Sequence, residues 1–174
     1  MRKDAQMPFI YSLIYVIFLG IISHFIGESI PRRKFDPDKF PFKLFSWENG
    51  GELYIKIGIK KWKNKLPDMS KIMKDMVPKK VNFNSTASDV TVLIQETCKA
   101  ELIHGLLCLV SPIIILFWID SSITAGIILT LIYILFNIPF IIIQRFNRPN
   151  LMRLAERLSK RDKKIKNENS DTLV

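Results

Sequence analysis

Histidine and cysteine are scarce in this chain, which contains two of each among 174 residues. Cys98 and Cys108 form no C-x-x-C pair, and no pair of histidines accompanies them in the sequence. Zinc sites and disulfide frameworks both need more such residues at closer spacing. We therefore expect no metal site, no disulfide framework and no cofactor.

Glycine is also sparse, with seven residues, and none of the glycine-rich signatures occurs. A phosphate-binding loop, the G-x-G-x-x-G fingerprint and the G-x-S-x-G elbow are all missing, which argues against nucleotide hydrolysis and against a serine hydrolase of the elbow type. No sequence signature of a nicotinamide or methyl-donor site is recognisable either. The function must rest on residues outside these motifs.

Apolar residues, by contrast, are abundant and grouped. They make up 48% of the chain while 24% is charged, the net charge is +10 and the mean hydropathy is positive. Three apolar runs approach the roughly 20 residues that a helix needs to cross a hydrocarbon core. We expect an all-α integral membrane protein that forms a single membrane-embedded domain over residues 1–174. Its expected parts are an N-terminal membrane helix at 8–26, a basic interfacial segment at 27–95, a transmembrane hairpin at 100–119 and 123–144, and a basic cytoplasmic tail at 145–174.

The hairpin follows from the short link Asp120-Ser121-Ser122 between the second and third runs. This link carries no Lys or Arg, whereas the segments before and after the hairpin are strongly basic. The positive-inside rule therefore places the link outside the cell membrane and both basic segments in the cytoplasm. Pro112 and Pro139 lie within the two runs, and each is expected to mark a kink or a loosened turn.

The N-terminal run allows more than one interpretation. Three complete spans would place Met1 outside, but Arg2 and Lys3 favour the cytoplasm. A basic start before an apolar run also resembles a signal sequence. No A-x-A-like cleavage site follows, and export of the basic middle segment would contradict its charge. We therefore favour a retained anchor or a re-entrant interfacial helix.

The middle segment combines lysines with apolar side chains. Gly50 and Gly51 indicate a turn, and the stretch from Leu53 to Lys65 has the composition of a basic amphipathic helix lying in the membrane surface. Attraction to anionic lipids would by itself account for the lysines. Because these charges adjoin membrane spans, lipid phosphates are nearer partners than nucleic acid, and we expect no nucleic acid partner.

Ionisable residues gather at the start of the second apolar run. On a helix Glu96, Glu101 and His104 fall on one face, with Glu101 and His104 three residues apart. A carboxylate there would orient the imidazole and raise its basicity, which makes the three residues candidates for catalysis. The alternative is a helix with ordinary interfacial charges and a hydrogen-bonded histidine. Di-iron bundles need two Glu-x-x-His elements, and this chain has only the one at Glu101 and His104.

A second polar cluster closes the third run. Asn137 and Gln144 are spaced to lie on one helix face, and Arg145 and Arg148 follow them. Arginine offers a planar fork suited to phosphate or carboxylate. The alternatives are positive-inside anchoring for the arginines and a contact between helices for Asn137. The hairpin model places this cluster at the same membrane face as His104.

The two clusters together resemble the glycosyl-4,4'-diaponeurosporenoate acyltransferases in the order and spacing of their residues. The matching stretches are Glu96-Thr97 with Lys99 to His104, Asn137-x-Pro139 with Ile141-Ile142, and Gln144-Arg145-x-Asn147-Arg148-Pro149-x-Leu151. Ile30-Pro31, Phe45, Glu48 and Lys61-Trp62-Lys63 also fit the pattern, so the resemblance covers most of the chain up to about Arg161. Gly105 stands where the pattern has a tryptophan, which bears on the identity of the substrate more than on the reaction type.

The resemblance implies a membrane acyltransferase that transfers a fatty acyl group to the sugar of a glycosylated C30 carotenoid acid, in staphyloxanthin-type pigment synthesis. The expected partners are a fatty acyl donor, either acyl-CoA or an acyl lipid, a glycosylated lipid acceptor and membrane lipids. The H-x-x-x-x-D motif of other acyltransferases is missing, so neutral His104, oriented by Glu101, is the expected general base. The expected substrate-binding residues are Asn137, Gln144, Arg145, Asn147, Arg148, Trp62 and Lys61, among which Asn147, Arg145 or Arg148 would hold the developing oxyanion or the phosphates of the donor.

The competing interpretation is a non-catalytic membrane protein that binds lipid or acts as a scaffold for partner enzymes. In that case His104 and Glu101 could be replaced with no loss of lipid turnover.

Overall fold

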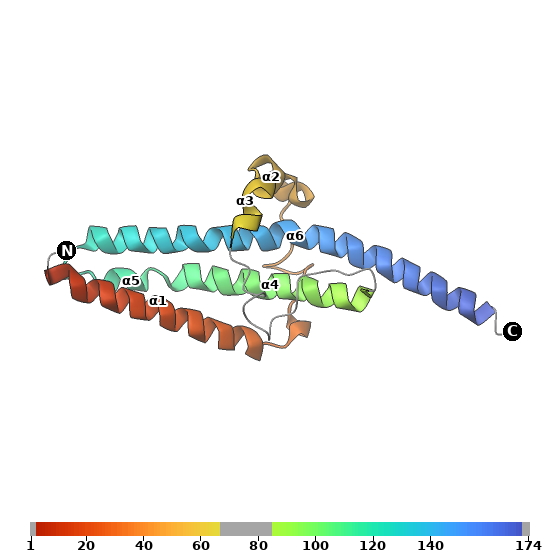
Figure 1. The fold of residues 1–174 in the computed structure, drawn as a ribbon, viewed down its shortest axis with the longest axis horizontal. Coiled ribbons are helices and arrows are strands. Elements are labelled where there is room, and N and C mark those ends of the chain that lie inside the picture. Colours follow the sequence, from red (N-terminus) through yellow and green to blue (C-terminus); the bar gives the residue numbers. More distant parts are fainter. Residues whose placement is uncertain (1–2, 67–84, 172–174) are drawn as a thin grey trace. The chain divides into compact units, whose positions relative to one another are not determined.

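The computed structural model describes residues 3–66 and 85–171, and within those ranges every regular element is helical (Figure 1). The three long helices are α1 (Lys3–Ser29), α4 (Ala87–Val110) and α6 (Ile123–Asp171). Each contains a stretch long and apolar enough to cross a membrane. Most large apolar side chains of α1 are exposed, as suits a helix in lipid. The expected all-α architecture with about three apolar helices is confirmed.

The helix boundaries differ from those expected. Helix α4 begins at Ala87, well before residue 100, because Thr86 and Asp89 form a reciprocal cap in which each backbone N–H donates to the other side chain, at 2.8 and 3.2 Å. It ends at Val110 before Pro112, as expected of a proline, and the short helix α5 (Ile113–Leu116) follows. Helix α6 runs unbroken through Pro139 and far into the expected tail.

The chain divides into two compact units. Unit 1 comprises Met1–Pro31 and Lys99–Ile142, and unit 2 comprises Arg32–Cys98 and Ile143–Val174. Helices α4 and α6 each contribute to both units, so the residues of the two sequence clusters are shared between the units. His104, Glu101 and Asn137 belong to unit 1. The expected substrate-binding residues of the middle segment and of the 144–148 stretch belong to unit 2, as does Glu96.

Unit 1 is held together by close helix contacts and by a few polar bonds. The Tyr15 hydroxyl on α1 donates to the Val110 carbonyl at 3.0 Å, and the Trp118 indole donates to Ser12 Oγ at 2.9 Å. A Cβ at Gly27 would lie 2.4 Å from the side chain of Ile103, so α1 and α4 approach closely there. Small residues that allow such approach, and polar bonds between helices, are the usual means of packing in lipid.

Unit 2 contains the short helices of the middle segment. In order they are the 3₁₀ turns η1 (Arg32–Lys34) and η2 (Ser46–Gly51), the helices α2 (Glu52–Lys56) and α3 (Ile59–Trp62), and the 3₁₀ turn η3 (Lys63–Lys65). Gly50 and Gly51 both have positive φ, which confirms the expected turn. The amphipathic helix expected from Leu53 to Lys65 is interrupted, because Gly58 adopts φ +73° and starts a new helix.

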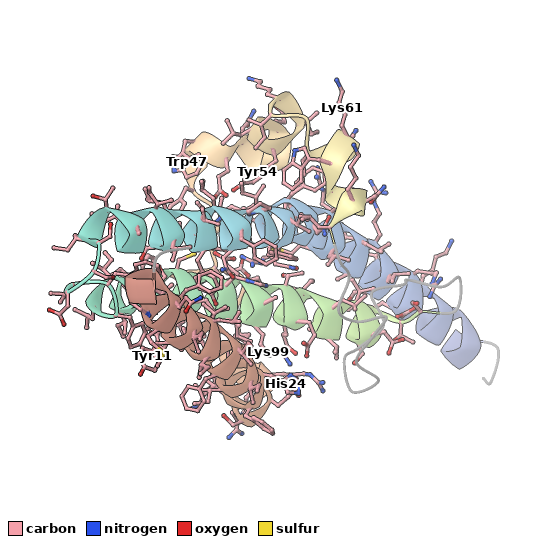
Figure 2. All side chains as sticks on the ribbon, turned by 60° about the vertical axis from the view of Figure 1, so that its left-hand side comes forward. Tyr11, His24, Trp47, Tyr54, Lys61 and Lys99 are labelled. Atoms are coloured by element: carbon pink, nitrogen blue, oxygen red, sulfur yellow. The ribbon has the colours of Figure 1, made fainter. Side chains whose placement is uncertain are left out.

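The core of unit 2 mixes apolar and charged side chains. Phe35, Ile59, Val90 and Cys98 are almost completely buried, and so are Glu48, Arg145 and Arg148. Figure 2 shows Tyr54 directed towards α6 and Lys61 on the outer side of the short helices. A buried arginine or glutamate is costly unless it is paired, so the partners of these charges define the unit.

Candidate functional site

His104 and Asn137 form a hydrogen-bonded pair inside unit 1. His104 Nδ1 on α4 lies 2.8 Å from Asn137 Oδ1 on α6. Asn137 is only 2% exposed, and its Nδ2 donates to the Tyr133 carbonyl one turn earlier in α6, at 2.9 Å. The amide is therefore held by its own helix, with its oxygen directed at the imidazole.

This arrangement assigns the tautomer of the imidazole. An amide oxygen only accepts hydrogen bonds, so Nδ1 must carry the hydrogen, and in the neutral ring Nε2 then carries the lone pair. The ring also stacks on Phe140, with centroids 4.7 Å apart and planes 8° from parallel. A histidine held in one orientation and one tautomer is suited to act as a base through Nε2.

Glu101, the expected orienting carboxylate, lies on the same helix and is 9% exposed. The contact that the structure records at His104 Nδ1 is made by Asn137, which the sequence suggested as a substrate-binding residue. The orienting role of Glu101 therefore stays a prediction. At Nδ1 it is Asn137 whose side chain holds the imidazole.

An apolar groove of about 250 Å³ lies in the same unit as this pair. It is lined by side chains of α1, α5 and α6, among them Leu13, Ile114, Leu129 and Phe136. Tyr133, whose carbonyl accepts the Asn137 amide hydrogen, also lines it. One lining residue, Tyr133, thus holds the amide that contacts the imidazole, and the apolar lining suits an alkyl chain.

A larger cavity, of about 540 Å³, lies in unit 2. Its polar lining comes from α3, η3, α4 and α6 and consists of Lys60, Lys63, Glu96, Thr97, Gln144, Asn147 and Asn150. Three of the expected site residues, Glu96, Gln144 and Asn147, therefore line one cavity. Glu96 also receives a hydrogen bond from Arg32 Nε at 2.8 Å.

Arg145 is buried against Glu48. Its Nε and NH2 donate to the two carboxylate oxygens of Glu48 at 2.7 and 2.6 Å, and its guanidinium also reaches the Pro41 and Lys43 carbonyls. Tyr54 donates its hydroxyl to the same carboxylate. This network fixes the segment before α2 onto α6 and gives Arg145 a structural task.

The protonation of this network follows from its contacts. Burial would raise the pKa of Glu48, but the hydrogen bonds from Arg145, Tyr54 and the Phe45 amide outweigh it and hold the pKa below its ordinary value. Burial, together with the bond to the Glu48 carboxylate, raises the pKa of the Tyr54 hydroxyl. The pair is therefore an ionised carboxylate with a neutral tyrosine at neutral pH.

Arg148 is completely buried in unit 2. Its Nε donates to Thr97 Oγ1 at 3.0 Å and its NH1 to the Phe42 carbonyl at 2.5 Å, and its guanidinium lies 5.8 Å from the Phe42 ring centroid. Like Arg145, it joins α6 to other parts of the unit. Substrate binding by either arginine stays a prediction.

The two candidates in the middle segment lie beside the cavity's lining. Lys61 is exposed, and Trp62 Nε1 reaches the Ile57 carbonyl at 3.5 Å. The side chains that line the cavity are those of their neighbours Lys60 and Lys63. Lys63 Nζ also lies over the Phe146 ring, 5.0 Å from its centroid.

Sequence reasoning did not assign roles to Thr97, Asn150 or Tyr54, and it met Glu48 only as part of a family pattern. One signal was available for Glu48, because an acidic residue between two aromatics and a glycine turn, in Phe45-Ser46-Trp47-Glu48-Asn49-Gly50-Gly51, suggests a carboxylate that is held locally. No such signal identifies its distant partner. Within the described parts of the chain, no three His, Cys, Asp or Glu side chains are grouped so as to hold a metal ion.

Comparison with known proteins gives a consistent result. The family model of glycosyl-4,4'-diaponeurosporenoate acyltransferase matches residues 31–157. A protein of that name from Staphylococcus aureus strain MRSA252 is 29% identical over 163 residues, which cover 92% of this chain and 95% of the relative. Another, from strain N315, is 30% identical over 162 residues with the same coverage. No solved structure matches the chain.

Proposed function

Since the chain belongs to the glycosyl-4,4'-diaponeurosporenoate acyltransferase family and is an acyltransferase, we propose that it acylates a hydroxyl of a glycosylated lipid. The acceptor in this proposal is the sugar of a glycosyl C30 carotenoid acid, and the donor is acyl-CoA or an acyl lipid. The product is an ester that carries a fatty acyl chain on the sugar, as in staphyloxanthin-type pigments.

The observation that carries the mechanism is the bond between His104 Nδ1 and Asn137 Oδ1. A sugar hydroxyl is a weak nucleophile, and a base that takes its proton during attack accelerates acyl transfer. In the proposed step His104 Nε2 takes this proton while the hydroxyl oxygen bonds to the acyl carbonyl carbon. The bond from that carbon to the donor's sulfur or oxygen then breaks, and the imidazolium returns the proton to the leaving group.

Asn137 acts in this step as a positioning residue. It accepts the Nδ1 hydrogen in both protonation states of the ring, so the imidazole need not reorient when it gains a proton. The charge that develops on the ring is stabilised by the amide oxygen, whose own orientation is fixed by the Tyr133 carbonyl. Preorganisation of this kind is the usual way in which a small site assists proton transfer.

The apolar groove is the proposed place of the acyl chain. Its lining is almost entirely hydrocarbon and aromatic, and Tyr133 connects it to Asn137. An acyl chain in this groove would have its carbonyl end near the imidazole if it entered with the chain directed along α1. Its volume, about 250 Å³, accommodates part of a fatty acyl chain, and the remainder would lie in the bilayer.

The three apolar helices associate this bacterial protein with membrane. The finer proposal is a multi-pass protein of the cell membrane, with the Asp120 to Ser122 link outside and the basic segments in the cytoplasm. The alternative function is a non-catalytic lipid-binding or scaffold protein. It requires no base, so replacement of His104 should leave lipid turnover unchanged.

The deciding experiment measures transfer of labelled fatty acid to a glycosyl carotenoid acid in membranes that carry His104→Gln. Glutamine keeps a hydrogen-bonding side chain but cannot take up the proton. The expected loss in kcat is about 10²–10⁴-fold, with normal accumulation of the protein. Wild-type turnover by His104→Gln would refute the base and leave the scaffold interpretation or a site elsewhere.

A further inference from the structure

Two amide side chains that line the cavity of unit 2 have no hydrogen-bond partner among the residues that the structure describes. Gln144 is 5% exposed and Asn147 is half-buried, and both line the cavity. Among the residues that the structure describes, none forms a hydrogen bond with either amide group. No fully buried side-chain nitrogen or oxygen in that part of the chain is unpaired, so the Gln144 amide must open onto the cavity.

A nearly buried amide that bonds to no described residue avoids a cost in free energy only if water or a ligand in the cavity bonds to it. The neighbouring side chains of Arg145 and Arg148 on α6, by contrast, donate to Glu48 and to Thr97. Gln144 and Asn147 are three residues apart on one helix, so their side chains are adjacent. The two amide groups that no described residue uses are therefore adjacent on one wall of the cavity, where a bound molecule can reach them.

The chemistry of this wall matches hydroxyl groups. An amide presents a donor and an acceptor side by side, and a sugar hydroxyl is likewise both donor and acceptor, so two adjacent amides match two neighbouring hydroxyls. The carboxylate of Glu96 also lines the cavity, and besides the bond from Arg32 Nε a carboxylate can accept hydroxyl hydrogens. Lys63 is already drawn over the Phe146 ring, and Lys60 is exposed at the margin.

We propose that this cavity is a carbohydrate subsite that binds the sugar ring of a glycosylated lipid through Gln144 and Asn147, with Glu96 as a further acceptor. The cavity, at about 540 Å³, is large enough for a hexose and its ordered waters. The inference rests on the proposed function only in that the acceptor is glycosylated. It concerns binding of the sugar and not the proton transfer at His104.

The test uses the full-length protein in lipid nanodiscs and hexyl β-D-glucopyranoside as the probe. Saturation-transfer NMR reports which probe protons contact the protein. We expect signals from the sugar ring protons with the wild-type protein and only chain signals with empty nanodiscs. Gln144→Leu and Asn147→Leu should each weaken the ring signals and raise the Kd roughly 3- to 10-fold.

The matched control is Gln95→Leu, which removes an amide from α4 outside the cavity lining and should leave glucoside binding unchanged. Because no residue in the described part of the chain bonds to the Gln144 amide, Gln144→Leu should keep or raise the unfolding temperature while it weakens binding. A purely structural amide would show the opposite. Should Gln144→Leu nevertheless fail to fold, Asn147→Leu at the half-buried position provides the same measurement.

Equal ring signals in wild type and both variants would overturn the proposal, and so would displacement of the glucoside by millimolar hexyl phosphate, which would mark an anion site. In the acyl-transfer assay Gln144→Leu should raise KM for the glycosylated acceptor with little change in kcat, whereas His104→Gln lowers kcat. Amide-dependent glucoside binding without acyl transfer would refute the proposed function alone. Acyl transfer without amide-dependent binding would refute the carbohydrate subsite alone.

Discussion

Arg145 and Glu48, 97 positions apart in the sequence, share a two-point ion pair in the interior of unit 2. Glu48 is completely buried and Arg145 is 7% exposed. Two charges taken out of water repay their desolvation only through each other, so the removal of one leaves the other as a buried unpaired charge. The stability of unit 2 should depend strongly on this pair.

Glu48→Gln should destabilise the protein by about 3–5 kcal/mol, the usual cost of leaving a buried partner charge uncompensated. The measurement is chemical unfolding of purified protein in detergent micelles, followed by circular dichroism. Asp36→Asn is the matched control, since it removes the carboxylate of the exposed pair with Lys39. The control should unfold like the wild type. Equal stability of all three proteins would mean that the pair contributes nothing.

Unfolding should also become easier in acid. The folded pKa of Glu48 lies below its ordinary value, so its contribution to stability is fully present above the unfolded pKa of about 4.3 and is lost as the pH falls through the depressed folded value. We expect the unfolding temperature in micelles to decline as the pH is lowered from about 4.5 to 2.5. Glu48→Gln should start lower and show a weaker decline. An identical acid limb in that variant would place the responsible carboxyl elsewhere.

Replacement of Asn137 should show how much the orientation of the His104 imidazole contributes to kcat, because the imidazole itself is kept. Asn137→Leu removes the acceptor of the Nδ1 hydrogen, so the ring loses its fixed tautomer. We expect kcat to fall roughly 10- to 100-fold, which is less than the 10²–10⁴ that loss of the positioned base itself would cost. Asn137→Asp keeps an acceptor at that place and should retain more activity. Steady-state acyl transfer at several pH values measures both. Equal activity of the Leu variant and the wild type would remove Asn137 from the mechanism.

A larger side chain in the apolar groove should change the preferred acyl chain length. Leu129 lines the groove, and Leu129→Trp would fill part of its 250 Å³. Short acyl donors should then be used almost normally, while long ones lose about tenfold in kcat/KM, as the loss of a few buried methylenes suggests. Leu131→Trp is the control, because Leu131 is exposed and does not line the groove. If both variants keep the wild-type preference, the acyl chain lies elsewhere.

Topology can be tested with single cysteines. In a background with Cys98 and Cys108 replaced by alanine, Ser121→Cys in the link should react with a membrane-impermeant maleimide added to intact cells. Ser159→Cys, in the basic part of α6, should react only after the cells are opened. Both cysteines reacting from the same side would contradict the hairpin orientation.

Hydropathy along the sequence predicted the three long helices. The three apolar runs appear as α1, α4 and α6, and Pro112 ends α4 as expected. Hydropathy measures transfer into lipid and not helix formation, so it could not show that α6 continues through the basic residues to Asp171. Pro149 in that stretch predicts a break, whereas the residues after it are mostly good helix formers with no glycine among them. Propensity therefore favours a helix in the tail but not its continuity with the apolar part.

For the candidate site, the sequence predicted some of the residues but not their contacts. Glu96 and Gln144 were identified from residue type and spacing and Asn147 from the family resemblance, and the structure places all three around one cavity. The partners of Arg145, Arg148 and His104 lie between 33 and 106 positions away in the sequence, so only the fold brings them together. A single sequence contains the side chains of such pairs but no information about which of them meet.

The serine hydroxyl on α1 has a bearing on how the protein is made. Ser12 accepts the Trp118 indole hydrogen, yet Trp118 is 106 positions later in the chain. At synthesis rates of about 5–20 residues per second, α1 waits roughly 5–20 s for that partner. During this time Ser12 can donate to the Pro8 carbonyl in its own helix, at 2.8 Å. The hydroxyl of the new helix is therefore bonded before Trp118 is made, and its oxygen can still accept the indole hydrogen afterwards.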